Sequence, residues 1–444
     1  MNPTELSGHR AAQATQGYDA IVVGARCAGA ATAMLLARKG YDVLLVDRAS
    51  FPSDTVSTHV IHPPGLTALR RWGLLNDLVA TGCPWLPAYT FDLGPLLITG
   101  TPAAADGTAG GYAPRRIVLD ELLVRAAEQA GAELREEFSV TELIADGDRV
   151  VGVRGHARGG MQVSEYARVV IGADGVHSRV AEQVNAPRYR ESPVLASGYY
   201  AYWSDVPATG GRWILRPGRG FFMIPTNDGL TLILAAWPQS EVARVKQDLQ
   251  GNYLREVTAA LGGRLDGGRQ ETRVVGEGVP NRFRTPYGPG WVLVGDAGYA
   301  KDPVTAQGIT DAFHDAEMCA DALDTVWRSG RGYDDALGDY QQRRDERALP
   351  MYEFTGQLAD LAVPPPLEMQ QLLGAIAGNQ KAMGEFASMF AGALPVPVFF
   401  NPAHIASLVG ADQLPDDHRT RRRGGAGPGH STTPAQTARS ADSS

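Results

Sequence analysis

The sequence predicts an α/β protein built from one layered core domain, an inserted β-sheet domain and a helical C-terminal region. Three observations indicate this fold class. Runs of β-branched residues alternate with amphipathic helical segments, residues 18–47 form a compact strand–helix–strand unit, and residues from about 193 to 237 hold short strands broken by Gly and Pro turns. No fixed-period repeat is present.

The composition allows a large core and excludes several classes of protein. The chain has 444 residues, 44% of them hydrophobic and 20% charged, which suits one big domain or two intertwined ones. A net charge of -8 argues against a protein that coats nucleic acid or an anionic membrane. Cys27, Cys83 and Cys319 are too few and too widely spaced for a disulfide framework or a metal site, so we expect no metal and a reducing cytosol.

The sequence predicts neither an N-terminal targeting signal nor a membrane-spanning segment. The N-terminus lacks an apolar core, and no stretch approaches the roughly 18 apolar residues of a membrane-spanning helix. We therefore expect a cytoplasmic protein. Residues 1–17 and 412–444 are polar and without periodicity, so both are expected to be disordered tails.

Regular elements follow from local patterns. Residues 18–24 and 41–47 are predicted strands that flank a helix over 27–39. Further core-facing helices are expected over 63–80, 117–131 and 304–328, where apolar residues recur at helical spacing.

The first chemical motif is the stretch from Gly24 to Gly29, Gly-Ala-Arg-Cys-Ala-Gly. It follows a strand and opens a helix, where unpaired N–H groups and a partial positive charge suit the pyrophosphate of a dinucleotide. Asp47 ends the second strand about 20 residues on, where its carboxylate would accept hydrogen bonds from the adenosine ribose. Arg26 replaces the usual middle glycine. Its guanidinium could pair with phosphate or point toward the active site, and the alternative is a plain surface arginine.

Two later segments specify the dinucleotide. The strand at 169–172 runs into Asp174 and Gly175, which taken alone would suit a helix cap. The strand at 291–294 runs into Gly295 and Asp296, and Pro303, Gln307 and Gly308 follow just before a long helix.

With these three motifs in order, the chain resembles the class A flavoprotein monooxygenases, the para-hydroxybenzoate hydroxylase-like family that also includes flavin-dependent halogenases and geranylgeranyl reductases. The resemblance covers about residues 18–360. It implies a Rossmann-like FAD-binding domain of three layers (ββα), an inserted β-sheet substrate domain and a helical C-terminal region. The expected boundaries are 18–80, 115–190 and 270–345 for the FAD-binding domain, 81–114 and 191–269 for the substrate domain, and 346–411 for the C-terminal region.

The resemblance also assigns roles to individual residues. Asp296 would bind the ribityl chain of FAD, Gly308 would open a helix aimed at the flavin, and Arg116, rather than Arg115, would contact the flavin. The chain departs from the family at Gly298–Tyr299 and at Ala306, where a glycine is usual. The residues expected to bind FAD are Gly24, Arg26, Cys27, Ala28, Gly29, Asp47, Arg48, Arg116, Asp174, Gly175, Gly295, Asp296, Pro303, Gln307, Gly308 and Ile309.

NAD(P)H is the expected electron donor. No second G-x-G-x-x-G follows a strand, so a separate nicotinamide domain is not expected and NAD(P)H would visit transiently, as the resemblance implies. The resemblance further implies that reduced flavin reacts with O2 to give a C4a-hydroperoxide, while the protein positions the substrate and excludes water.

Candidate catalytic and substrate residues come from two regions. His59 lies just past the second strand and could relay a proton, although a histidine that only bonds to its neighbours is an equal alternative. In the strand-rich insert, alternation puts either Tyr200 and Tyr202 or Tyr199 and Trp203 toward a cavity. We take Tyr200, Tyr202 and Phe222 as the candidate substrate contacts.

The predicted function is therefore a monooxygenase that hydroxylates or epoxidises a small aromatic or polycyclic metabolite, with FAD, NAD(P)H and O2. The alternatives are a geranylgeranyl-reductase-like enzyme, a partner-dependent enzyme and a non-catalytic flavin-binding protein. A halogenase is less favoured, because the resemblance implies a functional lysine early in the chain and residues 47–115 contain none. The partners expected are a small-molecule substrate and O2, without nucleic acid or membrane, for a monomer or homodimer.

Overall fold

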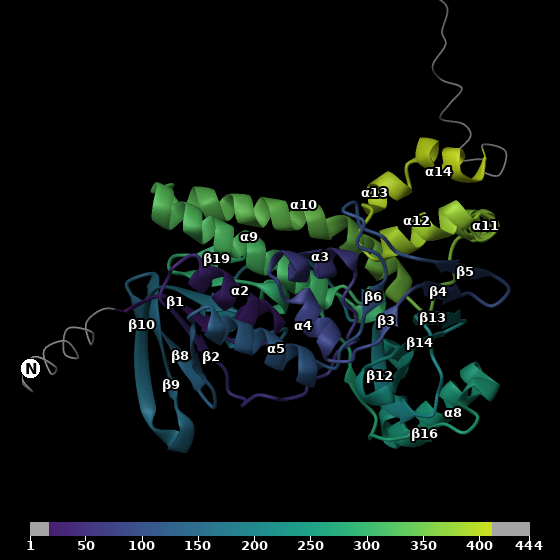
Figure 1. Cartoon of the computed structure of the whole chain (residues 1–444), viewed down its shortest axis with the longest axis horizontal. Helices are drawn as coiled ribbons and strands as arrows, with labels where there is room; N and C mark the ends of the chain where they lie inside the picture. Colours follow the sequence, from purple (N-terminus) through teal and green to yellow (C-terminus); the bar gives the residue numbers. More distant parts are fainter. Residues whose placement is uncertain (1–16, 411–444) are drawn as a thin grey trace, which may run out of the picture.

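A computed structural model of the chain describes residues 17–410 (Figure 1). The predicted tails, 1–17 and 412–444, lie outside the described residues except for residue 17. The described part confirms the mixed α/β fold class. Its central sheet has the order β19 (Tyr287–Gly288), β20 (Trp291–Leu293), β10 (Gln162–Gly172), β1 (Tyr18–Val23), β2 (Val43–Val46) and β7 (Glu133–Arg135), and it is parallel except for the antiparallel pair β19–β20.

Three layers form because successive residues of β1 point to opposite faces. Ala20 and Val22 pack under the helices, in a core shared with α2 (Cys27–Arg38), α5 (Arg116–Gln129) and α9 (Gly308–Ser329). Ile21 and Val23 pack on the other face, against β8 (Ser139–Asp146) and β9 (Arg149–His156). The result is the ββα layering that the sequence predicts.

A second sheet stands beside the first at the lower right of Figure 1. Its order is β16 (Arg269–Gln270), β12 (Ala196–Ser204), β15 (Thr231–Pro238), β14 (Arg219–Pro225), β13 (Gly211–Arg216), β4 (Tyr89–Asp92) and β5 (Leu97–Gly100), with β17 (Val275–Glu277) also on β12. A small three-stranded sheet links the two units and contains β11 (Arg188–Ser192), β18 (Asn281–Arg284) and β21 (Tyr299–Ala300).

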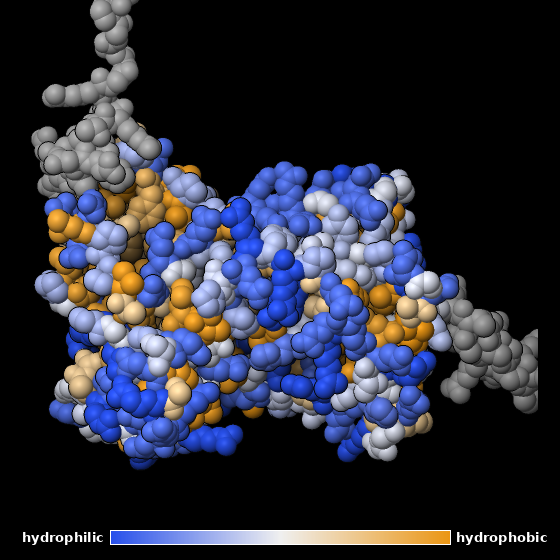
Figure 2. Space-filling model, turned by 180° about the vertical axis from the view of Figure 1, so that it is seen from behind, coloured by the Kyte–Doolittle hydropathy of each residue, from blue (hydrophilic) through white to orange (hydrophobic). Residues whose placement is uncertain are grey.

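Helices cover both faces of the second sheet. One face packs against α8 (Leu249–Leu261), and the other packs against helices near the C-terminus. These are α10 (Tyr333–Ala359), α11 (Leu367–Ala377), α12 (Gln380–Phe390), α13 (Val396–Phe399) and α14 (Pro402–Val409). Figure 2 shows patches of apolar surface, one of them at the upper left over this region, where Val363, Leu367 and Val398 remain exposed. Within residues 17–410, no helix is long and apolar enough to cross a membrane.

Two helix predictions were wrong in their bounds. Residues 63–80 form two helices, α3 (Pro63–Arg71) and α4 (Leu75–Ala80), because Gly73 adopts a left-handed conformation (φ +77°) and ends the first one. The helix predicted from residue 304 begins at Gly308, since Pro303–Thr305 form a 3₁₀ turn and Ala306 is left-handed. The helices over 27–39 and 117–131 are confirmed to within two residues of their predicted ends.

Candidate functional site

The turn that opens α2 accepts only glycine at its two ends. Gly24 has φ +101°, and a Cβ there would lie 2.5 Å from the carbonyl oxygen of Ala173. A Cβ on Gly29 would lie 1.7 Å from the carbonyl oxygen of Gly24. No side chain caps the N-terminus of α2 and its first turn holds no acidic residue. The helix therefore presents free N–H groups at Cys27 and Ala28, as a pyrophosphate site requires.

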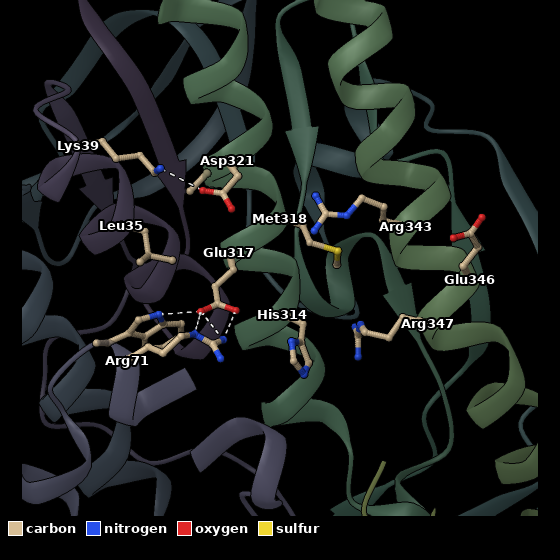
Figure 3. A pocket seen from close by; sticks show the side chains of 12 residues that line it. Leu35, Lys39, Arg71, His314, Glu317, Met318, Asp321, Arg343, Glu346 and Arg347 are labelled. Carbon is tan, nitrogen blue, oxygen red and sulfur yellow. Dashed lines mark hydrogen bonds and ion pairs between the residues drawn. The ribbon is translucent and has the colours of Figure 1, made fainter. Parts of the chain in front are cut away.

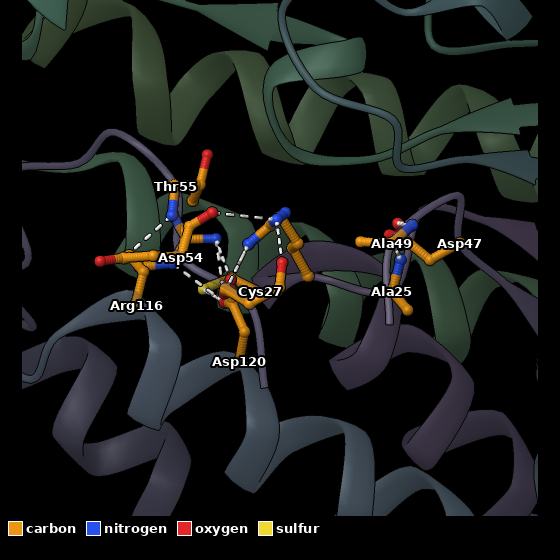
Figure 4. A network of polar contacts seen from close by, with 10 residues as sticks. Ala25, Cys27, Asp47, Ala49, Asp54, Thr55, Arg116 and Asp120 are labelled. Atoms are coloured by element: carbon orange, nitrogen blue, oxygen red, sulfur yellow. Dashed lines mark hydrogen bonds and ion pairs between the residues drawn. The ribbon is translucent and has the colours of Figure 1, made fainter. Parts of the chain in front are cut away.

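Asp47 closes this turn from the end of β2. Its carboxylate accepts hydrogen bonds from the backbone amides of Ala25 at 2.7 Å and Ala49 at 2.8 Å. The next residue, Arg48, is exposed. Asp47 thus stands beside the helix N-terminus, on the side away from Asp120 (Figure 4).

Gly295 and Asp296 lie directly next to the same turn. A Cβ on Gly295 would lie 2.8 Å from the Cβ of Ala28 in the first turn of α2. Asp296 keeps an exposed side chain between buried Gly295 and Ala297. Desolvation by the surrounding residues nevertheless raises the pKa of the Asp296 carboxyl to about 6. The positive charges of Lys301 and Arg116 act in the opposite direction and lower this pKa. Because β2 and β20 are strands of one parallel sheet, Asp47 and Asp296 share its carboxyl edge.

Arg26 and Arg116 converge on the fully buried carboxylate of Asp120 (Figure 4). Arg26 contacts it at 2.7 Å, and Arg116 binds both of its oxygens at 2.9 and 3.0 Å. Arg26 also donates to the Ser53 hydroxyl at 2.8 Å, so it ties the loop after β2 to α5. The Sγ atom of Cys27 lies 3.4 Å from Asp120, and burial raises the pKa of this thiol. Sequence reasoning did not find Asp120, whose partners are up to 94 residues away.

Asp174 and Gly175 lie at the carboxyl end of β10, between β1 and β20. Asp174 accepts hydrogen bonds from the amides of Arg179 at 2.7 Å and Val180 at 3.2 Å, and from the Ser178 hydroxyl at 2.5 Å. Its side chain therefore holds the start of the short helix α6 (Arg179–Gln183), the capping role that the sequence also allowed.

The loop from Pro303 to Ile309 leads into α9. Ala306, where the family usually has glycine, adopts φ +53°, so a left-handed residue is required here and alanine accepts it at a cost of roughly 1–2 kcal/mol. Gln307 is buried, and its side-chain amide donates to the Phe390 carbonyl at 2.7 Å. Gly308 has open space where a Cβ would project, whereas Ile309 packs in the helical core.

A network of charged side chains next to this loop was not predicted from the sequence. Lys301 pairs with Asp311, and Arg347 of α10 contacts Asp311 at 2.8 Å and Asp315 at 3.5 Å. Asp315 in turn accepts the backbone amide of Gly295 at 3.1 Å. The two basic side chains hold the pKa of Asp311 well below its usual range despite burial. The Gly295–Asp296 turn is thus fixed from α9 and α10.

His59 is fully buried and hydrogen-bonded to the second sheet. Its Nε2 atom lies 2.6 Å from the hydroxyl oxygen of Tyr202, and the two rings are stacked at 5.8 Å. Its Nδ1 atom is buried without a partner among the described residues. Burial, aided by the charges of Arg116 and Arg115, lowers the pKa of His59 to about 3, so the imidazole is neutral at neutral pH. The Arg115 guanidinium lies 5.0 Å from the centre of the Tyr202 ring.

Strand alternation separates the two predicted sets of aromatic residues onto opposite faces of the second sheet. Tyr200, Tyr202 and Phe222 share one face of the second sheet, while Tyr199 and Trp203 face α8 on the other. The first face contacts the loop at residues 303–307 directly, because Trp213 donates from Nε1 to the Val304 carbonyl at 3.0 Å. His62, another residue the sequence did not single out, bridges the Thr305 carbonyl at 3.0 Å and the Tyr89 hydroxyl at 2.8 Å.

These features fit the cofactor that the sequence implies. The glycine cradle at Gly24 and Gly29, the uncapped start of α2 and the exposed carboxylate of Asp296 lie along one sheet edge. That combination suits a dinucleotide whose pyrophosphate sits on a helix N-terminus. The aromatic face of the second sheet contacts the loop at residues 303–307, which follows Asp296 in the chain.

Comparisons with known proteins agree with this geometry. The family described as "FAD binding domain" matches residues 17–355. The chain is 26% identical to a digeranylgeranylglycerophospholipid reductase of Methanocella arvoryzae, over 73% of this chain and 81% of the relative.

Two solved structures share the fold. The myxobacterial chondrochloren halogenase CndH is 22% identical, with 85% of this chain and 97% of that chain covered and a TM-score of 0.73. The p-nitrophenol 4-monooxygenase PnpA from Pseudomonas putida DLL-E4 is 20% identical, with 85% and 98% covered and a TM-score of 0.70. At these identities the likeness concerns the fold.

Proposed function

Because this chain belongs to the FAD binding domain family, a family of FAD-dependent oxidoreductases, we propose that it is an NAD(P)H-driven monooxygenase of a small aromatic or polycyclic metabolite. Bound FAD would take electrons from NAD(P)H and activate O2. The remaining tasks of binding, orientation and exclusion of water fall to the residues of this chain.

The proposed cofactor site runs along the carboxyl edge of the central sheet. The first turn of α2, with Gly24, Cys27, Ala28 and Gly29, would hold the pyrophosphate. Asp47 and Arg48 would face the adenosine end. At the flavin end, the residues proposed to contact the cofactor are Arg116, Asp174, Gly175, Gly295, Asp296, Pro303, Gly308 and, through their backbones, Gln307 and Ile309. Arg26 is proposed to act indirectly, by fixing Asp120 and the loop at Ser53.

The observation that carries the monooxygenase proposal is the buried His59–Tyr202 pair on the aromatic face. Burial raises the pKa of Tyr202, so its hydroxyl stays protonated and can donate to Nε2 of the neutral His59. In that arrangement Nδ1 carries a proton and has no protein acceptor among the described residues. A hydroxyl or carbonyl oxygen of a substrate would accept this proton and be oriented by it.

The same pair weighs against a purely hydrocarbon substrate. A ligand without oxygen would leave the Nδ1 donor of His59 unpaired, and an unpaired buried donor costs about 1–3 kcal/mol. The geranylgeranyl-reductase-like function is kept as a second candidate, because the relative from Methanocella arvoryzae is named a reductase and the face around Phe222 is otherwise apolar. Halogenation is not favoured, since Lys301 is buried and already paired with Asp311.

The test is to load the purified chain with FAD and to follow NADH and NADPH oxidation and O2 uptake while phenolic and polycyclic metabolites are added one at a time. We expect some of them to accelerate both signals together. If no compound accelerates NAD(P)H oxidation, or if oxidation of many equivalents of NAD(P)H per FAD continues without O2, the monooxygenase proposal is wrong. Anaerobic saturation of an isoprenoid double bond would establish the reductase alternative instead.

A further inference from the structure

A cavity of about 800 Å³ is lined by none of the residues of the aromatic face (Figure 3). It is lined by α3, α9, α10 and the C-terminal end of α2, where Leu35 and Lys39 lie. Leu35 is eight residues beyond Cys27, which places it roughly 12 Å along the helix from the proposed pyrophosphate turn. The cavity is therefore separate from the proposed flavin site.

The acidic groups facing this cavity are largely occupied. Both oxygens of Glu317 bind Arg71, at 2.6 and 2.7 Å, and the Trp72 indole N–H donates to the same carboxylate at 3.0 Å. Asp321 pairs with Lys39 at 3.0 Å. The third acidic side chain of the lining, Glu346, is exposed and accepts a hydrogen bond from Gln342 at 2.8 Å. The lining thus holds three acidic groups against four basic ones, Lys39, Arg71, Arg343 and Arg347.

Two basic side chains of α10 also line the cavity, and one of them, Arg347, already binds Asp311 and Asp315. Arg343 and Arg347 are four residues apart, so they project from the same face of the helix, and Figure 3 shows both guanidinium groups pointing toward α9. Arg343 is exposed, and among residues 17–410 it has no hydrogen-bond or ion-pair partner. The Nε atom of Arg347 is buried and likewise lacks a partner within that part of the chain.

The remaining wall is apolar. Met318 and His314 of α9 face the cavity near these arginines, and Leu35 lies on the opposite side, on α2 (Figure 3). Burial and the charge of Arg347 lower the pKa of His314 to about 3, so at neutral pH its ring adds a polar surface without charge. The cavity thus offers a guanidinium pair at one side and an apolar wall at the other.

We propose that this cavity is a second ligand site, which binds a small amphipathic carboxylate with its charged end at Arg343 and Arg347 and its apolar body against Leu35 and Met318. Guanidinium groups bind carboxylates with paired hydrogen bonds, which makes the anion the matching ligand class. This proposal does not depend on the monooxygenase function.

Arg347 also connects this site with the Gly295–Asp296 turn, which we propose to contact the flavin. Its guanidinium holds Asp311 at 2.8 Å and Asp315 at 3.5 Å, and Asp315 accepts the amide of Gly295 beside Asp296. A carboxylate that draws on Arg347 competes with these two aspartates. Ligand binding should therefore change FAD affinity, and FAD should change ligand affinity by the same factor.

The experiment uses benzoate as the probe and benzamide as its uncharged counterpart, with binding to the FAD-loaded chain followed by calorimetry. We expect one saturable benzoate site that weakens roughly tenfold or more in Arg343→Gln and for benzamide. Arg255→Gln is the matched control, because Arg255 is an exposed arginine of α8 outside the cavity. FAD affinity, measured by flavin fluorescence, should shift with benzoate in the wild type and not in Arg343→Gln.

Three outcomes would overturn the proposal. They are the absence of saturable benzoate binding, equal binding of benzamide, and binding that survives Arg343→Gln but is lost in Arg115→Gln, which would place benzoate on the aromatic face. Benzoate binding without a shift in FAD affinity would overturn the coupling through Arg347.

Discussion

The Nε2 atom of His59 lies 2.6 Å from the hydroxyl oxygen of Tyr202, although the two residues are 143 positions apart in the sequence. This bond joins the loop after β2 of the FAD-binding sheet to β12 of the second sheet. Because burial desolvates the ring, and Arg116 and Arg115 add positive charge nearby, the pKa of His59 is lowered and the bond contains a neutral imidazole rather than an imidazolium. It therefore fixes the ring of His59 without charging it.

The variant Tyr202→Phe tests this pair. It removes the partner of Nε2, and we expect the free energy of unfolding to fall by about 1–2 kcal/mol and kcat/KM for an accelerating substrate to fall about a hundredfold, with FAD content unchanged. Tyr199→Phe is the control, because Tyr199 lies on the same strand, faces α8 and has a hydroxyl without a partner among the described residues. Equal activities in the two variants would contradict the proposed role of the pair.

The variant Gly24→Ala tests the pyrophosphate turn. The added Cβ meets the Ala173 carbonyl at 2.5 Å in a left-handed backbone, so the turn must shift and we expect most of the FAD to be absent from the purified protein. Gly40→Ala separates strain from collision, since Gly40 has φ +90° but open space around its Cβ. That control should lose about 1 kcal/mol of stability and keep its FAD. Normal flavin content in Gly24→Ala would remove this turn from the cofactor site.

The variant Arg26→Gly restores the glycine of the usual motif. Because Arg26 binds Asp120 and Ser53, we expect a loss of about 1–3 kcal/mol in unfolding free energy and an FAD dissociation constant within about threefold of the wild type. Urea unfolding and flavin fluorescence titration measure the two effects. A loss of FAD affinity of roughly tenfold or more, with stability unchanged, would instead make Arg26 a phosphate ligand.

The variant Asp302→Asn tests a buried acid at the start of the Pro303–Thr305 turn. Burial raises the pKa of Asp302 to about 7 from an ordinary 3.8, so the folded chain holds a proton that the unfolded chain releases. Wild-type stability from this group is present at low pH and is lost as the pH rises toward 7. Asparagine does not titrate and keeps the acceptor for the Val304 amide. Relative to the wild type, the variant should gain up to about 4 kcal/mol between about pH 4 and pH 8.

In the variant Asp106→Asn, we expect the stability difference from the wild type to change with pH in the opposite direction. Hydrogen bonds from Thr108, first from its backbone and then from its side chain, lower the pKa of Asp106 to about 2. This variant should therefore lose stability relative to the wild type as the pH rises from about 2 to about 4, and the difference should stay constant above that pH. Parallel pH profiles for the two variants would show that burial does not control Asp302.

The sequence was sufficient for features that depend on short segments. The strand–turn–helix at Gly24–Gly29 and the acidic residues that follow β2 and β20 are readable, because spacing along one chain segment dictates their geometry. The left-handed conformation at Ala306 was signalled only indirectly, by the departure from the family's glycine.

Features that depend on distant partners were not predictable. Asp120 has no motif of its own, and its role appears only when α5 brings it to Arg26, 94 residues away. Arg347 meets Asp311 across two long helices, and His62 meets Thr305 across 243 residues. The choice between the Tyr200–Tyr202 and Tyr199–Trp203 faces also depended on which helices cover each side of the sheet.

The most direct test of the central claim is the mass of the product formed under isotopically labelled dioxygen, with NAD(P)H and the first accelerating substrate. The account predicts a product that carries one labelled oxygen atom and that does not form without O2. An unlabelled product, or one that has gained only hydrogen, would contradict the monooxygenase proposal for this chain.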